Sequence, residues 1–79
     1  MQVTTPTTAL SVEASRLALV LILPGRRLSI PWEECSPRLA KASETERATL
    51  ELSPGGYGIH WPLLDEDLSV SGLLRSSGE

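Results

Sequence analysis

The sequence lacks several features that define whole classes of proteins. It has no phenylalanine, and its aromatic residues are two tryptophans and one tyrosine. Its single cysteine, Cys35, has no intramolecular partner for a disulfide, which favours a reducing, cytoplasmic location. Seven basic residues are spread along the chain beside ten acidic ones, for a net charge of −3. Because phosphate binding requires clustered positive charge, the composition argues against nucleic acid as a direct partner.

Long hydrophobic segments are also absent. The longest apolar run, Leu17 to Pro24, is far shorter than the ~20 residues that a membrane-spanning helix needs. The first six residues contain neither the basic nor the hydrophobic region of a secretory signal. We therefore expect a cytoplasmic protein with no membrane association. Hydrophobic residues make up 41% of the 79-residue chain, which is enough for one small globular domain.

Apolar and polar residues alternate in the first part of that domain, which we place at residues 9–75 between flexible ends at 1–8 and 76–79. Alternation from Ala9 to Ala14 predicts a strand with one buried face. The apolar run from Arg16 to Leu23 suits a buried strand or a buried helix. The Pro24-Gly25 turn signal and the renewed alternation from Arg27 to Trp32 favour a β-hairpin. The apolar run is then a central strand of the sheet or a strand covered on both sides.

The next segment carries helix start signals. Ser36 followed by Pro37 is an N-cap with proline at the first helical position, which predicts a helical turn from Pro37 to Ala42. Ser43 and Glu46 form the pattern of a capping box, which predicts a second turn from Glu44 to Ala48.

Alternation then returns and predicts a second hairpin. Its arms are Thr49 to Ser53 and a strand with Tyr57, Ile59 and Trp61 on one face, joined by Pro54-Gly55-Gly56 and ended by Pro62. The segment Asp65–Asp67 follows as an acidic connector, and Ser69 caps a last helix from Val70 to Arg75. The expected fold is α+β: a small, mostly antiparallel sheet of four to five strands (two hairpins plus an N-terminal strand) with a short helix on one face.

Several motifs of the chain resemble, taken together, a bacterial family known as domain of unknown function twenty-four forty-two. They extend over most of the sequence and comprise Gly25–Trp32, Ser36–Leu39 with Ala42, Ser43 and Arg47, Gly56–Pro62, Leu64–Val70 and Gly72–Leu74. The resemblance implies a small α+β protein, often encoded beside another small protein in a toxin–antitoxin-like pair. Some relatives carry a helix-turn-helix, for which this chain has no room after residue 75. The Glu33-Glu34-Cys35 segment departs from the family pattern, in which this link is shorter and more apolar.

Two residues could carry chemistry. His60 is the single histidine and suits a general base or a metal ligand, although alternation also makes it a strand residue that faces away from the core. Cys35 precedes a helix N-cap, where the helix dipole could lower its pKa and activate a thiol nucleophile. The simpler interpretation is a small, half-buried thiol.

The acidic connector admits three interpretations: a cap or salt bridge, a partner-binding surface, or a site for a hard cation. We expect an Arg38–Asp65 or an Arg47–Asp67 ion pair that clamps the helical turns to this connector. Trp32 and Trp61 are expected in the core, one of them only partly buried.

No catalytic constellation is visible, so we predict a non-enzymatic protein-interaction module, plausible as the antitoxin-like partner of another small protein. The alternative is a regulator that binds a small ligand or cation through Asp65, Asp67 and His60. We expect no cofactor and no catalytic or metal site, and either a protein partner or a homodimer. The residues expected to bind the partner or to form the clamp are Arg38, Arg47, His60, Trp61, Asp65, Glu66 and Asp67.

Overall fold

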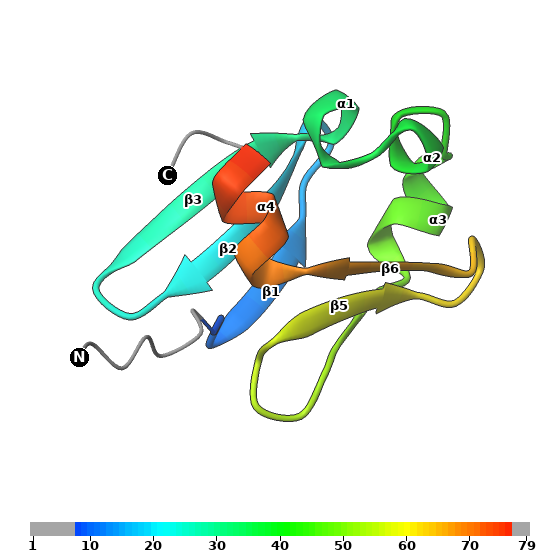
Figure 1. Ribbon diagram of the computed structural model, residues 1–79. Coiled ribbons are helices and arrows are strands. Elements are labelled where there is room, and N and C mark those ends of the chain that lie inside the picture. Colours follow the sequence, from blue (N-terminus) through cyan, green and yellow to red (C-terminus); the bar gives the residue numbers. More distant parts are fainter. Residues whose placement is uncertain (1–7, 77–79) are drawn as a thin grey trace.

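The chain folds into two three-stranded antiparallel sheets that share one core (Figure 1). The structure is a computed structural model, and it describes residues 8–76. The first sheet has the order β1-β2-β3 and the second the order β4-β5-β6. The strands are β1 (Ser11–Ala14), β2 (Ala18–Leu23), β3 (Arg26–Pro31), β4 (Glu51–Leu52), β5 (Gly58–Trp61) and β6 (Glu66–Ser69). The helices are α1 (Trp32–Cys35), α2 (Pro37–Ala40), α3 (Glu44–Ala48) and α4 (Val70–Ser76).

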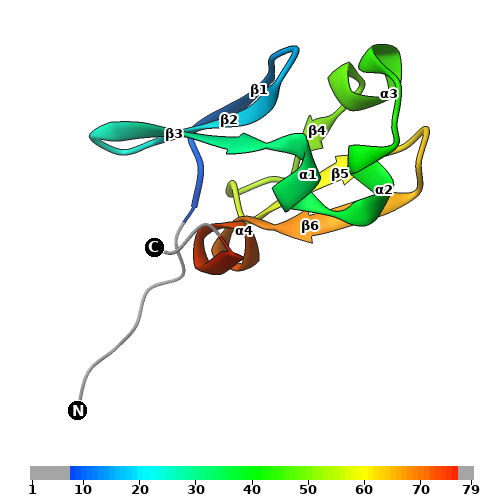
Figure 2. The same ribbon diagram turned by 90° about the horizontal axis from the view of Figure 1, so that it is seen from above.

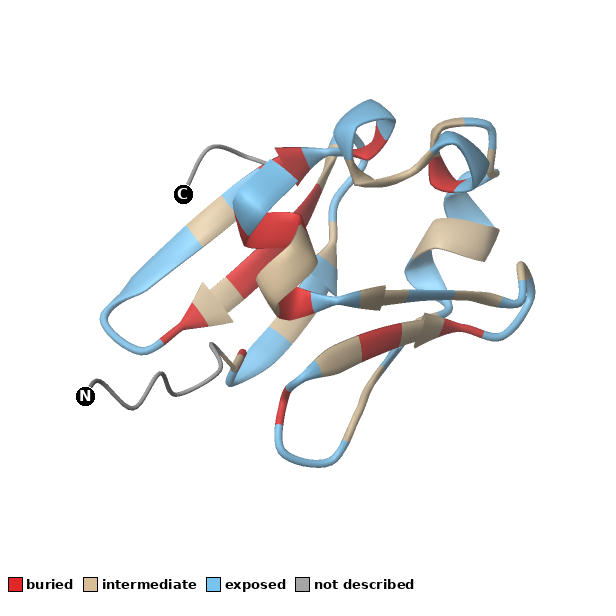
Figure 3. Cartoon of the chain, viewed as in Figure 1, coloured by how far each residue is buried: buried red, intermediate tan, exposed pale blue. Residues whose placement is uncertain are grey.

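The first sheet is the predicted hairpin with the predicted N-terminal strand beside it. Gly25 adopts φ 78° directly after Pro24, which is the geometry of a type II turn. The apolar run forms β2, which lies between β1 and β3, so the prediction of a central strand is confirmed. Leu19, Leu21 and Leu23 of β2 are buried. Buried residues of the molecule gather on β2, β5 and α4 (Figure 3).

Three short helices connect the two sheets and lie beside one another at one end of the molecule (Figure 2). Both predicted caps of this region are present. The Ser36 hydroxyl accepts from the Leu39 amide at 3.1 Å, and Ser43 and Glu46 form the reciprocal capping box at 3.1 and 2.8 Å. Helix α1 was not predicted. Pro31 cannot donate to a strand ladder, and the acidic residues at 33 and 34 favour the first turn of a helix, so β3 ends there and α1 begins at Trp32.

The second sheet corrects the predicted strand arrangement. The acidic segment Asp65–Asp67 is not a connector throughout, because Glu66 and Asp67 belong to β6. The chain reverses in a tight turn in which the Leu64 amide donates to Trp61 O at 3.1 Å and Asp65 adopts φ 52°. Strand β6 then pairs with β5. The α+β class and the antiparallel pairing are confirmed, but six strands in two sheets replace one sheet of four to five.

Both tryptophans lie at the centre of the core, with 0% exposure, so the expectation that one would be partly buried is wrong. Their rings meet edge to face, with centroids 6.4 Å apart. Tyr57 was expected on the inner face of its strand, but it precedes β5 and is 53% exposed. Leu10, which alternates with Ala9 in the predicted first strand, is 66% exposed. Its neighbour Ala9 is buried instead, where its amide donates to Gly56 O at 2.8 Å.

Helix α4 closes the core from the C-terminal side. Ser69 accepts from the Gly72 amide at 2.9 Å, which confirms the predicted cap, and Val70, Leu73 and Leu74 are buried. No helix of residues 8–76 has the length and apolarity to cross a membrane. The flexible ends predicted at 1–8 and 76–79 fall, apart from residues 8 and 76, outside the described residues.

Candidate functional site

Arg47 organises the helical end of the core. Its guanidinium donates to Leu39 O at 2.9 Å and to Ala40 O at 3.0 Å, and its Cζ lies 5.3 Å from the centroid of the Trp32 ring. Two of its five N–H groups thus serve carbonyls of α2, and its charge lies against a ring face. The predicted Arg47–Asp67 ion pair is absent from the described part of the chain, and Arg47 is a structural residue.

Arg38 also binds a carbonyl rather than a carboxylate. Its guanidinium donates to Leu64 O at 2.8 Å, so α2 is tied to the turn that precedes β6. The expected clamp between helix and acidic segment therefore exists, but without the predicted Asp65 carboxylate. Trp61 contributes to the same structure, because its indole N–H donates to Arg47 O at 3.1 Å. Of the predicted site residues, Arg38, Arg47 and Trp61 thus serve the fold.

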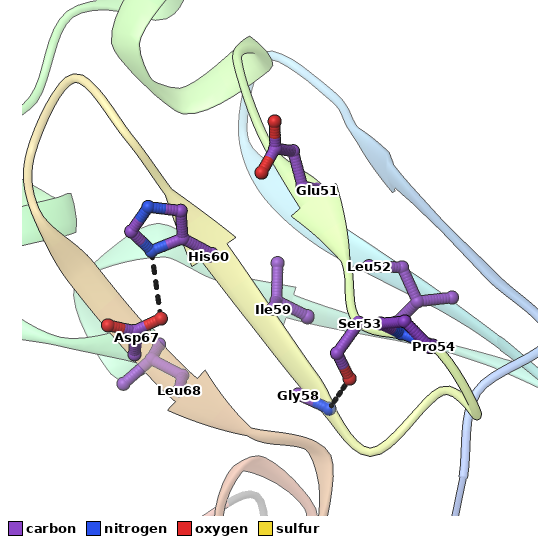
Figure 4. A pocket seen from close by; sticks show the side chains of 9 residues that line it. All are labelled: Glu51, Leu52, Ser53, Pro54, Gly58, Ile59, His60, Asp67 and Leu68. Carbon is purple, nitrogen blue, oxygen red and sulfur yellow. Dashed lines mark hydrogen bonds and ion pairs between the residues drawn. The ribbon is translucent and has the colours of Figure 1, made fainter.

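His60 and Asp67 lie on the opposite, outer face of the second sheet. They face each other across β5 and β6, and His60 Nδ1 lies 2.8 Å from Asp67 Oδ1 (Figure 4). Their side chains are 38% and 75% exposed, so the prediction that His60 points away from the core is confirmed. Glu51 lies opposite His60 on its other side, in β4. The three residues form a row across the sheet, which we call the polar row.

A groove of about 310 Å³ lies beside the polar row. Gly58 lines the groove, and Ser53 fixes the neighbouring wall, since its hydroxyl accepts from the Gly58 amide at 2.9 Å (Figure 4). None of the described helices contributes to this lining, which is mostly apolar. The lining residues are Glu51, Leu52, Ser53, Pro54, Gly58, Ile59, His60, Asp67 and Leu68.

The charge around this groove has one sign. From Ala48 to Leu74 the sequence contains four carboxylates and no lysine or arginine. Glu51 and Asp67 are exposed on the groove rim, Asp65 is exposed in the adjoining turn, and Glu66 is half-buried in β6. The second sheet therefore presents an acidic surface.

The geometry does not favour a metal centre. Asp65, Asp67 and His60 were the alternative prediction for a cation site, but nowhere in residues 8–76 do three histidine, cysteine or carboxylate side chains gather as ligands. Asp67 is engaged with His60, while Asp65 lies in the turn before β6.

Cys35 is a half-buried thiol at the end of α1, as the simpler prediction had it. Burial is the main cause that raises its pKa to about 12, with the Glu34 carboxylate adding to the effect and Arg47 opposing it. The Sγ atom lies 3.7 Å from Ile30 O. The alternative interpretation, in which a helix dipole lowers this pKa and activates the thiol, is not supported, because burial raises the pKa instead.

The raised pKa predicts slow alkylation of Cys35. Because the thiolate is the reactive form, a thiol pKa of about 12 leaves little reactive species at pH 8. We expect iodoacetamide to modify the folded protein on the order of a thousandfold more slowly than the chain in concentrated urea, where the pKa returns to ~8.5. Mass spectrometry of timed samples measures both rates. Equal rates would show that the thiol is exposed and unperturbed.

Comparison with known proteins identifies the family of this chain. The family model described as "Protein of unknown function (DUF2442)" matches residues 9–79. The chain belongs to this family. A solved structure, described as a crystal structure of a protein of unknown function from Rhodospirillum rubrum ATCC 11170, superposes with a TM-score of 0.79 at 28% sequence identity. The match covers 90% of this chain and 88% of that one. None of the curated proteins matches the sequence.

Proposed function

We propose that this DUF2442 chain is a non-enzymatic protein-interaction module, the antitoxin-like partner of another small protein, and that it binds through the outer face of the β4-β5-β6 sheet. The observation that supports this proposal is the groove beside the polar row. No described helix contributes residues to the lining of this groove. The lining is mostly apolar, with polar groups on one side. A concave apolar surface with a few convergent polar groups is the usual form of a binding site.

The chemistry of the groove favours binding over catalysis. The hydroxyl of Ser53 already accepts a backbone hydrogen bond. Cys35 lies outside the groove and has a raised rather than a lowered pKa. His60 is oriented by Asp67, but among the described residues no activated nucleophile or metal cluster accompanies it. A site that orients groups without activating a nucleophile can recognise a partner but supplies little rate acceleration.

Affinity capture from the native cell lysate tests the proposal. We expect the tagged wild-type protein to retain one small protein, identified by mass spectrometry, and we expect Gly58→Val to lose it because the valine side chain fills the groove. The Glu44→Gln variant, which removes an exposed carboxylate on α3, serves as the matched control and should retain the partner. Thermal unfolding shows that each variant is folded. If the wild-type protein retains nothing, the interaction module is refuted.

A further inference from the structure

Gly58 lines the groove at a position where neither the backbone conformation nor a close contact requires a glycine. Gly55 and Gly56 adopt φ of 87° and 77°, which an L-residue accommodates poorly, and a side chain at Gly56 would meet the backbone of Ala9. Gly58 has no positive φ. A Cβ built there would meet Leu68 O at 3.5 Å and Ser53 Oγ at 3.8 Å, which are ordinary contacts.

A glycine inside a strand weakens the strand, because it has no side chain to pack and the greatest conformational entropy to lose. Where neither backbone conformation nor a tight contact explains it, such a glycine often marks a place where another backbone or a ligand approaches closely. Gly58 fits that description, since it is the first residue of β5, lines the groove, and has its own amide satisfied by Ser53. The hollow above Gly58 is therefore shaped for contact with another chain.

The hollow and the polar row have a fixed spacing. Gly58 and His60 are two residues apart on β5 and share the outer face of the sheet. In extended backbone this corresponds to about 7 Å, which is also the distance between side chains i and i+2 on one face of an extended peptide. An extended segment that runs along β5 can therefore place one side chain in the hollow and the next side chain of the same face against Glu51, His60 and Asp67.

The charge of the polar row selects the second side chain. Glu51 and Asp67 lie on either side of His60 and are both exposed. Arg38 and Arg47 form no ion pair with these two carboxylates. Arg38 donates to Leu64 O instead, and Arg47 donates to carbonyls of α2. A lysine or arginine of a partner would complement these two carboxylates.

Resting on the proposed function, we infer that the groove binds an extended segment of the partner protein in which a small apolar residue and a lysine or arginine are two positions apart. The small apolar side chain occupies the hollow above Gly58. The basic side chain lies across the polar row and pairs with Glu51 and Asp67. Specificity then has two independent sources, shape at Gly58 and charge at the row.

An array of immobilised octapeptides tests this inference directly with the purified protein. The peptides present valine or alanine two positions from arginine or lysine, in both chain directions, within a serine and threonine background. Two matched sets replace the basic residue by glutamate or place it next to the apolar residue. We expect binding to the first set alone. The strongest peptide is then measured in solution by fluorescence anisotropy.

Variants separate the two sources of specificity. We expect Gly58→Val and the double variant Glu51→Gln/Asp67→Asn each to lower the affinity for the peptide by about tenfold or more. This is the effect of losing a filled pocket or a charge pair at an interface. Glu44→Gln should leave the affinity within about twofold, since a remote surface charge contributes little. Higher salt should weaken binding to the wild-type protein but not to the double variant.

The outcomes distinguish this inference from the proposed function. If no peptide binds, if the glutamate set binds equally, or if spacing has no effect, the inference is overturned. It is also overturned if purified protein dimerises through the groove, which light scattering would show as a doubled mass that Gly58→Val abolishes. Suppose that the wild-type protein and Glu51→Gln/Asp67→Asn capture the same partner from lysate but Gly58→Val does not. That result would leave the proposed interaction module standing and refute the inferred pairing with a basic side chain of the partner.

Discussion

Replacing Gly56 by alanine is expected to lower the free energy of unfolding by about 3 kcal/mol or more. A left-handed backbone conformation costs an L-residue roughly 1–2 kcal/mol by itself. The added Cβ would also overlap the carbonyl oxygen of Ala9, and that atom belongs to the backbone and cannot rotate away. The chain would have to separate at the point where the Ala9 amide donates to Gly56 O at 2.8 Å, which loses a further ~0.5–1.5 kcal/mol.

Gly25→Ala is the matched control for this prediction. Gly25 has nearly the same φ, 78° against 77°, but nothing lies within 4 Å of a Cβ placed there. Its substitution should cost only the conformational strain, roughly 1–2 kcal/mol. Urea denaturation followed by circular dichroism gives both values. Equal losses in the two variants would show that the contact between Ala9 and Gly56 does not hold the two sheets together in solution.

Gly25 and Gly56 also differ in whether their structural surroundings can be predicted from the sequence. The Pro24-Gly25 turn, the Ser36 cap, the Ser43 capping box and the Ser69 cap were all predicted, because each depends on residues within four positions of one another. The contact of Gly56 with Ala9 was not predicted, since it joins segments more than forty residues apart. Burial of Ala9 in place of Leu10 follows from that contact.

Strand β6 was missed for a related reason. Its sequence, Glu66 to Ser69, has a single apolar residue and shows no alternation that would separate it from a loop. The strand exists because the turn at Asp65 brings it beside β5, where the ladder supplies its hydrogen bonds. Tertiary pairing therefore decides the conformation of a segment whose local propensity is weak.

The arginine partners were mispredicted because opposite charge was given too much weight. Exposed ion pairs contribute little, whereas buried carbonyls at helix ends require donors. Arg47 donates to carbonyls of α2, Arg38 donates to Leu64 O in the turn before β6, and Asp67 pairs with His60. Of the polar row, His60 and Asp67 were named from the sequence, but Glu51 was not. Its place in the row depends on the register of β4 against β5, which only the folded sheet sets.

The second large effect is expected at Trp32, whose substitution by alanine should cost about 3–5 kcal/mol. The ring is fully buried and packs edge-on against Trp61 at 6.4 Å. Its indole N–H donates to Ser15 O at 2.9 Å, and the Arg47 guanidinium lies over its face. Alanine removes all of these contacts and leaves a cavity where both sheets and the helices meet. Because small domains are stable by only ~5–15 kcal/mol, this variant should be largely unfolded or close to it at 37 °C.

Trp32→Phe separates ring packing from the polar contacts. Phenylalanine keeps an aromatic ring against Trp61 but cannot donate to Ser15 O, so it should lose less than half of what alanine loses. Thermal unfolding measures the stability of both variants, and the fluorescence of Trp61, the remaining indole, reports whether the core admits water. If alanine and phenylalanine cost the same, the hydrogen bond to the β1–β2 turn rather than the ring would hold this core together. Similar stability of all three proteins would show that the paired tryptophans are not its centre.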